Sequence, residues 1–244
     1  MSSTPPGQSV AYRIRFDECG PDGRLRPSGH LRLAQDVAWI HSENLGFGRD
    51  WYRERGLTWL VRAIALDIAA GSEFGETLGL TTRVVGWRRV WARRRTTFEV
   101  DGRVRAVALT DWVLLGPTGA PVRVPAEIAA AFTVEPPSFA PLRVELPDPP
   151  DHVARVAVAV RQGDLDPMGH VNHAVYLDYA DAALAQGHGA QRLHRAELEY
   201  LLPADAATAP AGRLWRLGHA WAYLLEDDAG RPLFRARLRT SATG

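Results

Sequence analysis

A short internal repeat constrains the fold of this chain more than any other feature. The pentapeptide PMGHV at residues 167–171 lines up with PSGHL at residues 27–31, 140 positions upstream. Each copy opens a stretch in which apolar residues recur at helical spacing. We therefore expect two copies of one unit of about 120 residues, each with a polar loop that leads into a long helix.

Hydrophobic patterning places the same elements in the same order in both halves. Each half begins with a strand, continues with the polar loop and the helix, and ends with strands rich in β-branched and aromatic residues. The pattern predicts an α+β fold with two units, in each of which a curled antiparallel sheet wraps a long helix. The later strands of the first half are expected to form one long antiparallel meander. The expected elements are a strand at 10–16, a helix from 31 to about 43 and strands at 58–68, 78–87, 90–100 and 104–115, then a strand at 153–160, a helix from 171 to about 185 and strands at 196–202, 213–225 and 232–239.

A proline-rich segment separates the two halves. Six prolines lie from Pro136 to Pro150, a density that excludes a central strand or a helix and suits an extended spacer. The sequence therefore predicts an N-terminal unit at residues 10–131, a linker at 132–151 and a C-terminal unit at 152–241.

Composition excludes several classes of protein. The net charge of +1 argues against a nucleic-acid partner held by bulk charge. The single cysteine, Cys19, excludes an internal disulfide and fits a reducing compartment. The first residues lack the cationic and apolar regions of a signal peptide, and no stretch reaches the roughly 18 apolar residues of a membrane span. We therefore expect a cytoplasmic protein without a membrane span.

The second copy of the repeat carries the residues that could do chemistry. Asp164, Asp166, His170 and Asn172 lie at the mouth of the predicted helix, and such a set can hold and activate a water molecule. Carrying the offset of 140 back to the first half puts arginines, Arg24 and Arg26, in the places of the two acids. Only the second unit then keeps the acids, so we expect one active site.

These residues resemble the signature of a known family. Asp164, Asp166, Gly169, Val171 and Tyr176 match Asp-x-Asp-x-x-Gly-x-Val-x-x-x-x-Tyr, which is typical of hotdog-fold acyl thioesterases. The fuller Asp-Leu-Asp-x-x-x-His-Val-Asn string is similar to the acyl-acyl carrier protein (acyl-ACP) thioesterases of plants and bacteria. Further similar positions occur in the first half at residues 33–41, 45–46, 56–59 and 111–114.

The resemblance implies a fold and an activity. The fold would be a double hotdog over about residues 10–240. The activity would be hydrolysis of an acyl thioester without a metal or another cofactor, with the first unit binding the acyl group. The predicted substrate-binding residues of the second unit are Asp164, Gly169, Val171 and Tyr176.

Thioester hydrolysis assigns roles to the catalytic candidates. Asp166 is the best candidate for the base or the nucleophile, and His170 could hydrogen-bond the water or orient Asp166. Asn172 could be a helix cap or a positioning group, while backbone N–H groups at the start of the helix could polarise the carbonyl. In the alternative reading, Asp164 and Asp166 only cap the helix entry and His170 is a satisfied core histidine.

The chain departs from the family pattern at two places. Met168 stands where the carrier-protein enzymes have an asparagine, and Pro203-Ala204 replaces a polar pair expected after Glu199-Tyr200. Asp205 supplies the second catalytic carboxylate if the strand is shifted by one residue, or else it is a surface turn residue. The simpler Asp-Pro-x-Gly arrangement of coenzyme A thioesterases remains, so the carrier could be acyl carrier protein or coenzyme A.

A cluster of arginines in the first half could bind the carrier. Guanidinium groups pair with phosphates and carboxylates, so the cluster could grip pantetheine phosphate or an acidic carrier protein, or it could be an exposed strand face. The cluster consists of Arg88, Arg89, Arg93, Arg94 and Arg95, of which Arg88, Arg89 and Arg93 are the predicted substrate contacts.

The leading hypothesis for the whole chain is a thioester hydrolase. Two alternatives stay open, a non-catalytic acyl-binding or carrier-docking protein and a hotdog hydratase or dehydratase. The chain could also form a homodimer.

Overall fold

The chain divides into two compact units. The computed structural model describes residues 7–132 and 139–242, so Pro136 and Pro137 of the predicted linker lie outside the described residues. The first unit comprises Met1–Arg62 and Ile68–Pro141, and the second comprises Ala63–Asp67 and Leu142–Gly244. The boundary after Pro141 falls inside the predicted linker, whereas the assignment of Ala63–Asp67 to the second unit was not foreseen.

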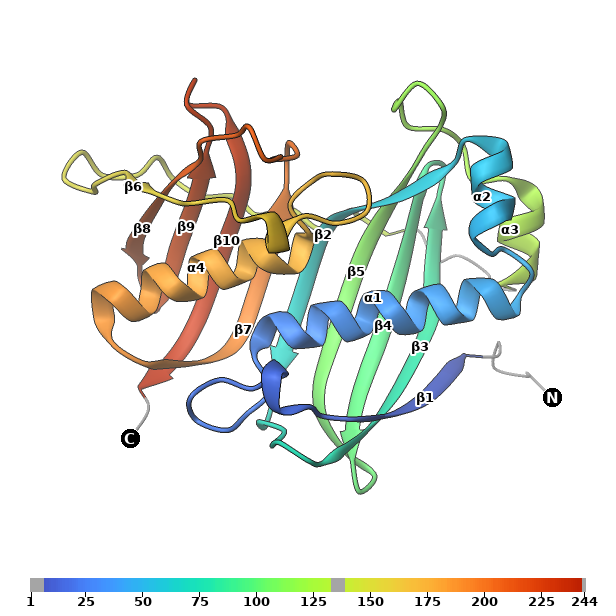
Figure 1. Cartoon of the computed structure of the whole chain (residues 1–244), viewed down its shortest axis with the longest axis horizontal. Coiled ribbons are helices and arrows are strands. Elements are labelled where there is room, and N and C mark those ends of the chain that lie inside the picture. Colours follow the sequence, from blue (N-terminus) through green and yellow to red (C-terminus); the bar gives the residue numbers. More distant parts are fainter. Residues whose placement is uncertain (1–6, 133–138, 243–244) are drawn as a thin grey trace. The chain divides into compact units, whose positions relative to one another are not determined.

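The first unit wraps a sheet around the long helix α1 (Figure 1). Its strands follow the order β1-β3-β4-β5-β2, and the pairs β1–β3, β3–β4 and β4–β5 are antiparallel. The helix buries Leu31, Leu33, Val37 and Ala38. Burial of each of the larger side chains stabilises the fold by about 1.5–3 kcal/mol. The elements are β1 (Gln8–Arg13), η1 (Phe16–Glu18), α1 (Pro27–Asn44), α2 (Arg49–Arg55), β2 (Thr58–Ile68), β3 (Thr77–Arg88), β4 (Trp91–Val100), β5 (Arg103–Leu115) and α3 (Ala126–Ala131).

The second unit repeats this design around helix α4 (Figure 1). Ala63–Asp67 of β2 pairs with β7, and the order continues β7-β10-β9-β8-β6. The helix begins at the capping residue Asn172 and ends before Gly189, whose φ of +71° suits glycine. The elements are β6 (Val156–Ala157), η2 (Gln162–Asp164), α4 (His173–His188), β7 (Gln191–Tyr200), β8 (Ala211–Leu217), β9 (Ala220–Glu226) and β10 (Pro232–Ala242).

The prediction of an α+β fold with a long helix wrapped by antiparallel strands in each unit is confirmed, but the described strands are ordered in one sheet rather than two, and several elements differ. The expected strand at 213–225 is two strands joined by a turn at Gly218, whose φ is +60°. The expected strand at 153–160 pairs with β8 only at Val156–Ala157. In addition, β2 lies next to β5 in the sheet and not next to β3. The meander therefore consists of β3, β4 and β5 only.

Two short helices of the first unit were also missed. Helices α2 and α3 are too short to show a clear period in the sequence. Tertiary packing stabilises them, because Tyr52 of α2 and Ile128 of α3 belong to one buried cluster with Phe47 and Phe132. Helix α1 begins at Pro27, four residues before the expected start, since proline suits the first turn of a helix.

Candidate active site

The loop between η2 and α4 is closed by its own backbone. Asp166 donates its N–H to the carbonyl of His170 at 2.8 Å, and Gly169 donates to the carbonyl of Asp166 at 2.9 Å. Asn172 donates to the carbonyl of Asp164 at 2.8 Å. Gly169 has a φ of +78°, which a side chain would strain. The loop at residues 164–172 is therefore a tight, internally bonded structure, and Gly169 serves its geometry.

A second segment holds this loop from the side. Val171 donates its N–H to the carbonyl of Ala204 at 2.8 Å, and His170 forms a β-bridge with Asp205. The hydroxyl of Tyr176 accepts the N–H of Ala204 at 2.9 Å. Tyr176 is buried, which raises its pKa to about 12. Val171 and Tyr176, predicted to contact substrate, here anchor residues 204–205 beside the loop.

Asp164 is buried and its carboxylate is fully engaged. It accepts hydrogen bonds from the backbone N–H of Arg161 at 2.9 Å, the guanidinium of Arg161 at 2.9 Å and the hydroxyl of Tyr179 at 2.7 Å. Burial by itself raises the pKa of Asp164, but these hydrogen bonds outweigh it and hold the pKa below its usual range. The arrangement suits an anchor of the loop and leaves little room for a substrate.

Asp166 is held differently. It is half-buried, and its Oδ1 accepts the N–H of Met168 at 2.8 Å and the more distant N–H of His170 at 3.3 Å. Within residues 7–132 and 139–242, no salt bridge reaches this carboxylate and its Oδ2 accepts no hydrogen bond. The Asp166 carboxylate is therefore oriented through Oδ1, and its Oδ2 has spare acceptor capacity among the described residues.

His170 and Asn172 lie on either side of Val171 at the entry to α4. Both are half-buried. Asn172 caps the helix, since its Oδ1 accepts the N–H of Ala174 at 3.0 Å. To the extent that the chain is described, the Nδ2 group of Asn172 and the ring of His170 make no hydrogen bond. Two polar groups that follow Asp166 in the same loop thus remain available among the described residues.

The backbone N–H groups at the start of α4 are less available than expected. Val171 donates to Ala204, Asn172 donates to Asp164, and Ala174 donates to the Asn172 side chain. These three N–H groups already have protein acceptors, so they do not polarise a carbonyl in this conformation. The Nδ2 group of Asn172 is a donor at the same end of the helix.

Asp205 is a turn residue that lies close to His170. Its Oδ1 accepts the hydroxyl of Thr208 at 2.9 Å and the N–H groups of Ala207 and Thr208 at 2.9 and 3.0 Å. The hydrogen bond from Thr208 is the largest cause of its lowered pKa, and the charge of His170 contributes. The carboxylate is exposed and directed into its own turn, although the backbone bridge places it next to His170.

Met168 is one of the exposed large hydrophobic side chains of the described residues. Its side chain is 45% exposed, so it does not fill an apolar site beside His170.

The arginine cluster of the first unit does not form one surface. Arg93 makes a bidentate pair with buried Asp111 at 2.6 and 2.7 Å, and Arg94 is buried against His41 and the ring of Phe132. Arg88 and Arg89, in contrast, are exposed at the turn between β3 and β4. Alternation along β4 separates Arg93 from Arg94, so only part of the cluster can meet a partner.

The first unit contains a counterpart of the loop, but at an offset of 146 residues. Gly20 donates to Arg24 and Gly23 donates to Gly20, as Asp166 donates to His170 and Gly169 to Asp166 in the second unit. Gly23 also has a positive φ, of +74°. The bridge between Cys19 and Leu25 matches the bridge between Leu165 and Val171.

This register corrects the predicted one. Glu18 occupies the place of Asp164 and accepts the N–H of Arg15 at 2.9 Å and the hydroxyl of Tyr12 at 2.6 Å. Gly20 occupies the place of Asp166. Arg24 and Arg26 replace His170 and Asn172 rather than the acids. The expectation that the first unit lacks both acids is therefore wrong, although it has no carboxylate in the place of Asp166.

His30 is not the counterpart of His170. It lies inside α1, 1% exposed, with its ring against Phe98, and burial lowers its pKa to about 4. The sequence repeat at an offset of 140 misled because the two pentapeptides occupy different elements. In the first unit the pentapeptide is the first turn of a helix, whereas in the second unit it is part of the loop.

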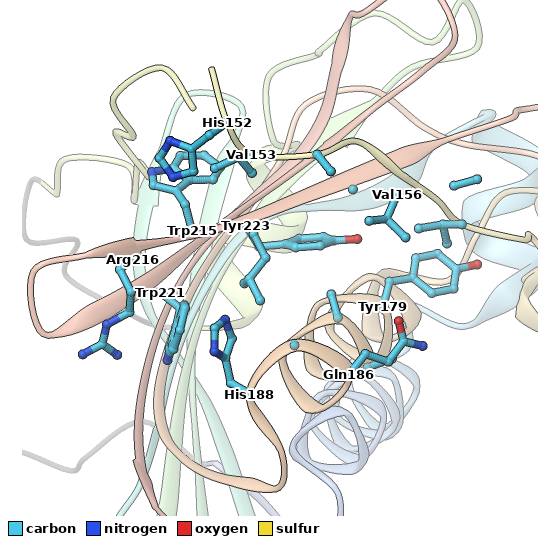
Figure 2. Close-up of a pocket in the computed structure, with 18 of the residues that line it drawn as sticks. His152, Val153, Val156, Tyr179, Gln186, His188, Trp215, Arg216, Trp221 and Tyr223 are labelled. Carbon is cyan, nitrogen blue, oxygen red and sulfur yellow. The ribbon is translucent and has the colours of Figure 1, made fainter. Parts of the chain in front are cut away.

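A cavity in the second unit was not foreseen. It has a volume of about 740 Å³ and lies between the second half of α4, strands β8 and β9, and the segment at residues 152–159 (Figure 2). Tyr179, whose hydroxyl bonds Asp164, lines one part of it, and His188 lines another. A sequence signal for it is the set of small residues Ala182, Ala183 and Gly187, which line the cavity from α4.

The described part of the chain shows neither a metal centre nor a membrane helix. No group of three or more His, Cys, Asp or Glu side chains in it could hold a metal ion. None of the described helices combines the length and the apolar character that crossing a membrane requires.

Comparisons with known proteins agree with the resemblance of the motif. Residues 8–132 match the family model of the acyl-ACP thioesterase N-terminal domain, whereas comparison with curated protein sequences finds no match. The fold is similar to that of a protein described as an oleoyl thioesterase from Lactobacillus plantarum (TM-score 0.87, 22% identity, 99% of each chain covered). It is also similar to an acyl-ACP thioesterase from Bacteroides thetaiotaomicron (TM-score 0.83, 16% identity, 96% of this chain and 98% of that chain) and to the 12:0-ACP thioesterase from Umbellularia californica (TM-score 0.82, 19% identity, all of both chains).

At these identities the solved structures establish the double hotdog fold, and the family model adds the activity. Because that model matches 125 of the 244 residues, the chain belongs to the acyl-ACP thioesterase family and is a thioester hydrolase.

Proposed function

We propose that the protein releases acyl groups from acyl carrier protein and that Asp166 activates the attacking water. The observation that carries this proposal is the contrast between the two acids of the loop. Asp164 is saturated by Arg161 and Tyr179, whereas Asp166 is oriented by the N–H of Met168, and its Oδ2 accepts no hydrogen bond from the described residues. A general base needs that combination of fixed position and free acceptor capacity.

The neighbouring side chains supply the other functions that hydrolysis requires. The Asp166 carboxylate takes a proton from water as the water attacks the thioester carbon. The tetrahedral intermediate then needs a donor for its oxyanion, and the Nδ2 group of Asn172 is such a donor at the entry to α4. His170 can orient the water or protonate the leaving thiolate, since its ring faces no protein partner among the described residues. Asp205 serves by positioning, because its carboxylate is bonded into its own turn beside His170.

The test is a single-turnover measurement on a matched pair of variants. Asp166→Asn should lower acyl release from acyl-ACP by about 10²- to 10⁴-fold, the usual contribution of a positioned base. Asp22→Asn is the control, since Asp22 is the exposed carboxylate of the counterpart loop and accepts the N–H of Arg24 at 3.1 Å. The control should keep the wild-type rate. If folded Asp166→Asn keeps more than half of the activity, Asp166 is not the base.

The carrier is recognised, in this proposal, by the exposed arginines. Arg88 and Arg89 are exposed and can meet an acidic carrier surface, although Arg88 also donates to the carbonyl of Phe139 at 3.1 Å, whereas Arg93 is committed to Asp111. Replacing Arg88 and Arg89 with serine should raise KM for acyl-ACP and weaken its salt dependence, while hydrolysis of a free acyl-pantetheine thioester is unchanged. Equal effects on both substrates would contradict the docking role. A homodimer stays a prediction, which sedimentation of the protein tests.

A further inference from the structure

The segment beside the loop at residues 164–172 has a counterpart in the first unit. In the second unit, Val171 donates its N–H to the carbonyl of Ala204 at 2.8 Å. In the first unit, Leu25 donates in the same way to the carbonyl of Ser72 at 2.8 Å. The neighbouring residue pair forms a β-bridge in each unit, and the two bridges are His170–Asp205 and Arg24–Glu73.

The turn after each bridge supports this correspondence. Asp205 donates its N–H to the hydroxyl of Thr208 at 2.9 Å, and Glu73 donates its N–H to the carboxylate of Glu76 at 2.6 Å. In both units the acceptor is three residues further along the chain. Residues 204–208 therefore have the place that residues 72–76 have in the first unit.

One contact of the second unit has no counterpart in the first. The hydroxyl of Tyr176 accepts the N–H of Ala204 at 2.9 Å. At the offset of 146 that relates the two loops, His30 occupies the place of Tyr176. Its Nε2 and the Oγ of Ser72 are both buried, and neither atom has a hydrogen-bond partner among the described residues. The first unit therefore holds its segment without the contact that Tyr176 makes.

The packing of its ring fixes the position of the Tyr176 hydroxyl. Tyr176 is 3% exposed, and its ring lies 5.6 Å from that of Tyr200 and 5.3 Å from that of Phe234 between centroids. Burial raises the pKa of Tyr176 to about 12, and the charges of Asp166 and Asp205 contribute to the rise. The ring therefore presents a neutral hydroxyl, close enough to both carboxylates for their charges to reach it.

The contact with Ala204 bears on hydrolysis because of the residue that follows. Asp205 is negatively charged, since hydrogen bonds in its own turn lower its pKa, and the bond from Thr208 is the largest cause. The β-bridge places this charge beside His170. A carboxylate next to a histidine can fix the orientation of the imidazole ring. A shift of residues 204–205 would therefore move the group that orients His170.

We propose that Tyr176 is a positioning residue for hydrolysis. Its hydroxyl holds the N–H of Ala204, and in this way it keeps the Asp205 carboxylate in place beside His170. The proposal rests on the proposed function and adds a residue that supports the reaction without touching the substrate. Loss of the hydroxyl should therefore lower kcat and leave KM unchanged.

A matched pair of buried tyrosines tests the role of the hydroxyl. Tyr176→Phe removes the acceptor of the Ala204 N–H, whereas Tyr200→Phe removes a hydroxyl that donates to the carbonyl of His173 at 3.0 Å. Each variant loses one hydrogen bond to the backbone and keeps its ring. Tyr176→Phe should lower kcat for acyl-ACP about 10- to 100-fold with KM within about twofold, since a misplacement of about 1 Å can cost about 10²-fold in rate.

The control variant, Tyr200→Phe, should keep kcat and KM within about twofold of the wild type. Thermal unfolding shows that both variants are folded. An unchanged kcat in Tyr176→Phe, equal losses of kcat in the two variants, or a loss confined to KM would overturn the positioning role.

A double-mutant cycle tests whether Tyr176 acts through Asp205. Asp205→Asn keeps an oxygen for the bonds of its turn and removes the charge beside His170. If the two residues act as one unit, Tyr176→Phe should change kcat by less than about twofold in the Asp205→Asn background. Losses that multiply would overturn the route through Asp205.

A measurement without turnover separates this proposal from the proposed function. The ring signals of His170 in nuclear magnetic resonance spectra, identified by their absence in His170→Gln, report the place of the Asp205 charge. They should shift in the same direction in Tyr176→Phe and in Asp205→Asn, and they should stay in place in Tyr200→Phe. That result supports the positioning role even if no thioester is hydrolysed. Hydrolysis by the wild type together with unmoved His170 signals in Tyr176→Phe would overturn the role and leave the activity intact.

Discussion

The two units build the same loop from different side chains. In both, a short 3₁₀ helix is followed by the same set of backbone hydrogen bonds and a glycine of positive φ, at an offset of 146 residues. Glu18 and Asp164 anchor the two loops through the same kind of contacts, with a backbone N–H and a tyrosine hydroxyl. The polar side chains then differ at three positions, because Gly20, Arg24 and Arg26 occupy the places that Asp166, His170 and Asn172 have in the second unit. Under the proposed function, the loop backbone is a scaffold, and these three positions carry the difference between the catalytic copy and its counterpart.

Exchanging the loops would test this conclusion with the largest expected effect. Replacing residues 164–172 with the first-unit sequence ECGPDGRLR should leave the protein folded, because the backbone bonds of the two loops coincide. Acyl release should fall by about 10²- to 10⁴-fold, or roughly 3–5 kcal/mol of barrier, since Asp166 and His170 are lost together. Thermal unfolding and single-turnover kinetics measure the two properties. A chimera that fails to fold would show that the two loops are not interchangeable scaffolds.

The anchoring acids should matter for stability in both units. Asp164→Ala leaves the Tyr179 hydroxyl and the Arg161 N–H without their acceptor and should cost about 1–3 kcal/mol of unfolding free energy. Glu18→Ala should cost about 1 kcal/mol, because its contacts are closer to solvent. Urea unfolding measures both losses. A loss in one unit only would show that the counterpart contacts are not equivalent.

The Asp164 contribution should also depend on pH in a defined direction. Its pKa is lower in the folded protein than the ordinary value of about 3.9, so the folded state binds fewer protons. The stabilisation is present above pH 4 and is lost as the pH falls through the lowered pKa. The difference in unfolding free energy between the wild type and Asp164→Ala should therefore stay constant from pH 7 to about 5 and shrink below about 4. A difference that grows on acidification would contradict the anchoring role.

The sequence predicted the parts of the fold that hydrophobic periodicity determines. The two long helices and most strands follow from patterning, whereas α2 and α3 depend on packing against Phe47 and Phe132. The turn at Gly218 was missed because apolar residues continue on both sides of it. The strand at 153–160 was overpredicted, since alternating valines predict a strand but do not decide whether the neighbouring edge is close enough to pair.

The site was predictable as a set of residue types but not as a set of contacts. The motif identified Asp164, Asp166, His170 and Asn172, yet only hydrogen bonds to Arg161 and Tyr179 show which acid is committed. The repeat was aligned by the identical residues Pro, Gly and His, and this put the first unit out of register by six positions relative to the backbone pattern. Sequence identity over five residues therefore indicates the equivalent positions of the two units less well than the order of turn and helix does.

The smallest expected effect belongs to Met168, whose counterpart in the first unit is Asp22. The carrier-protein enzymes that the motif resembles have an asparagine at this position, so Met168→Asn tests whether such an amide holds the attacking water. Because Met168 is 45% exposed, the exchange should change the unfolding free energy by less than about 0.5 kcal/mol. The N–H of residue 168, which orients Asp166 at 2.8 Å, is unaffected by the side chain. We therefore expect the single-turnover rate to stay within about twofold of the wild type. A tenfold faster variant would show that the amide reaches the attacking water, and that the loop chemistry involves a fourth position besides the three that distinguish the two units.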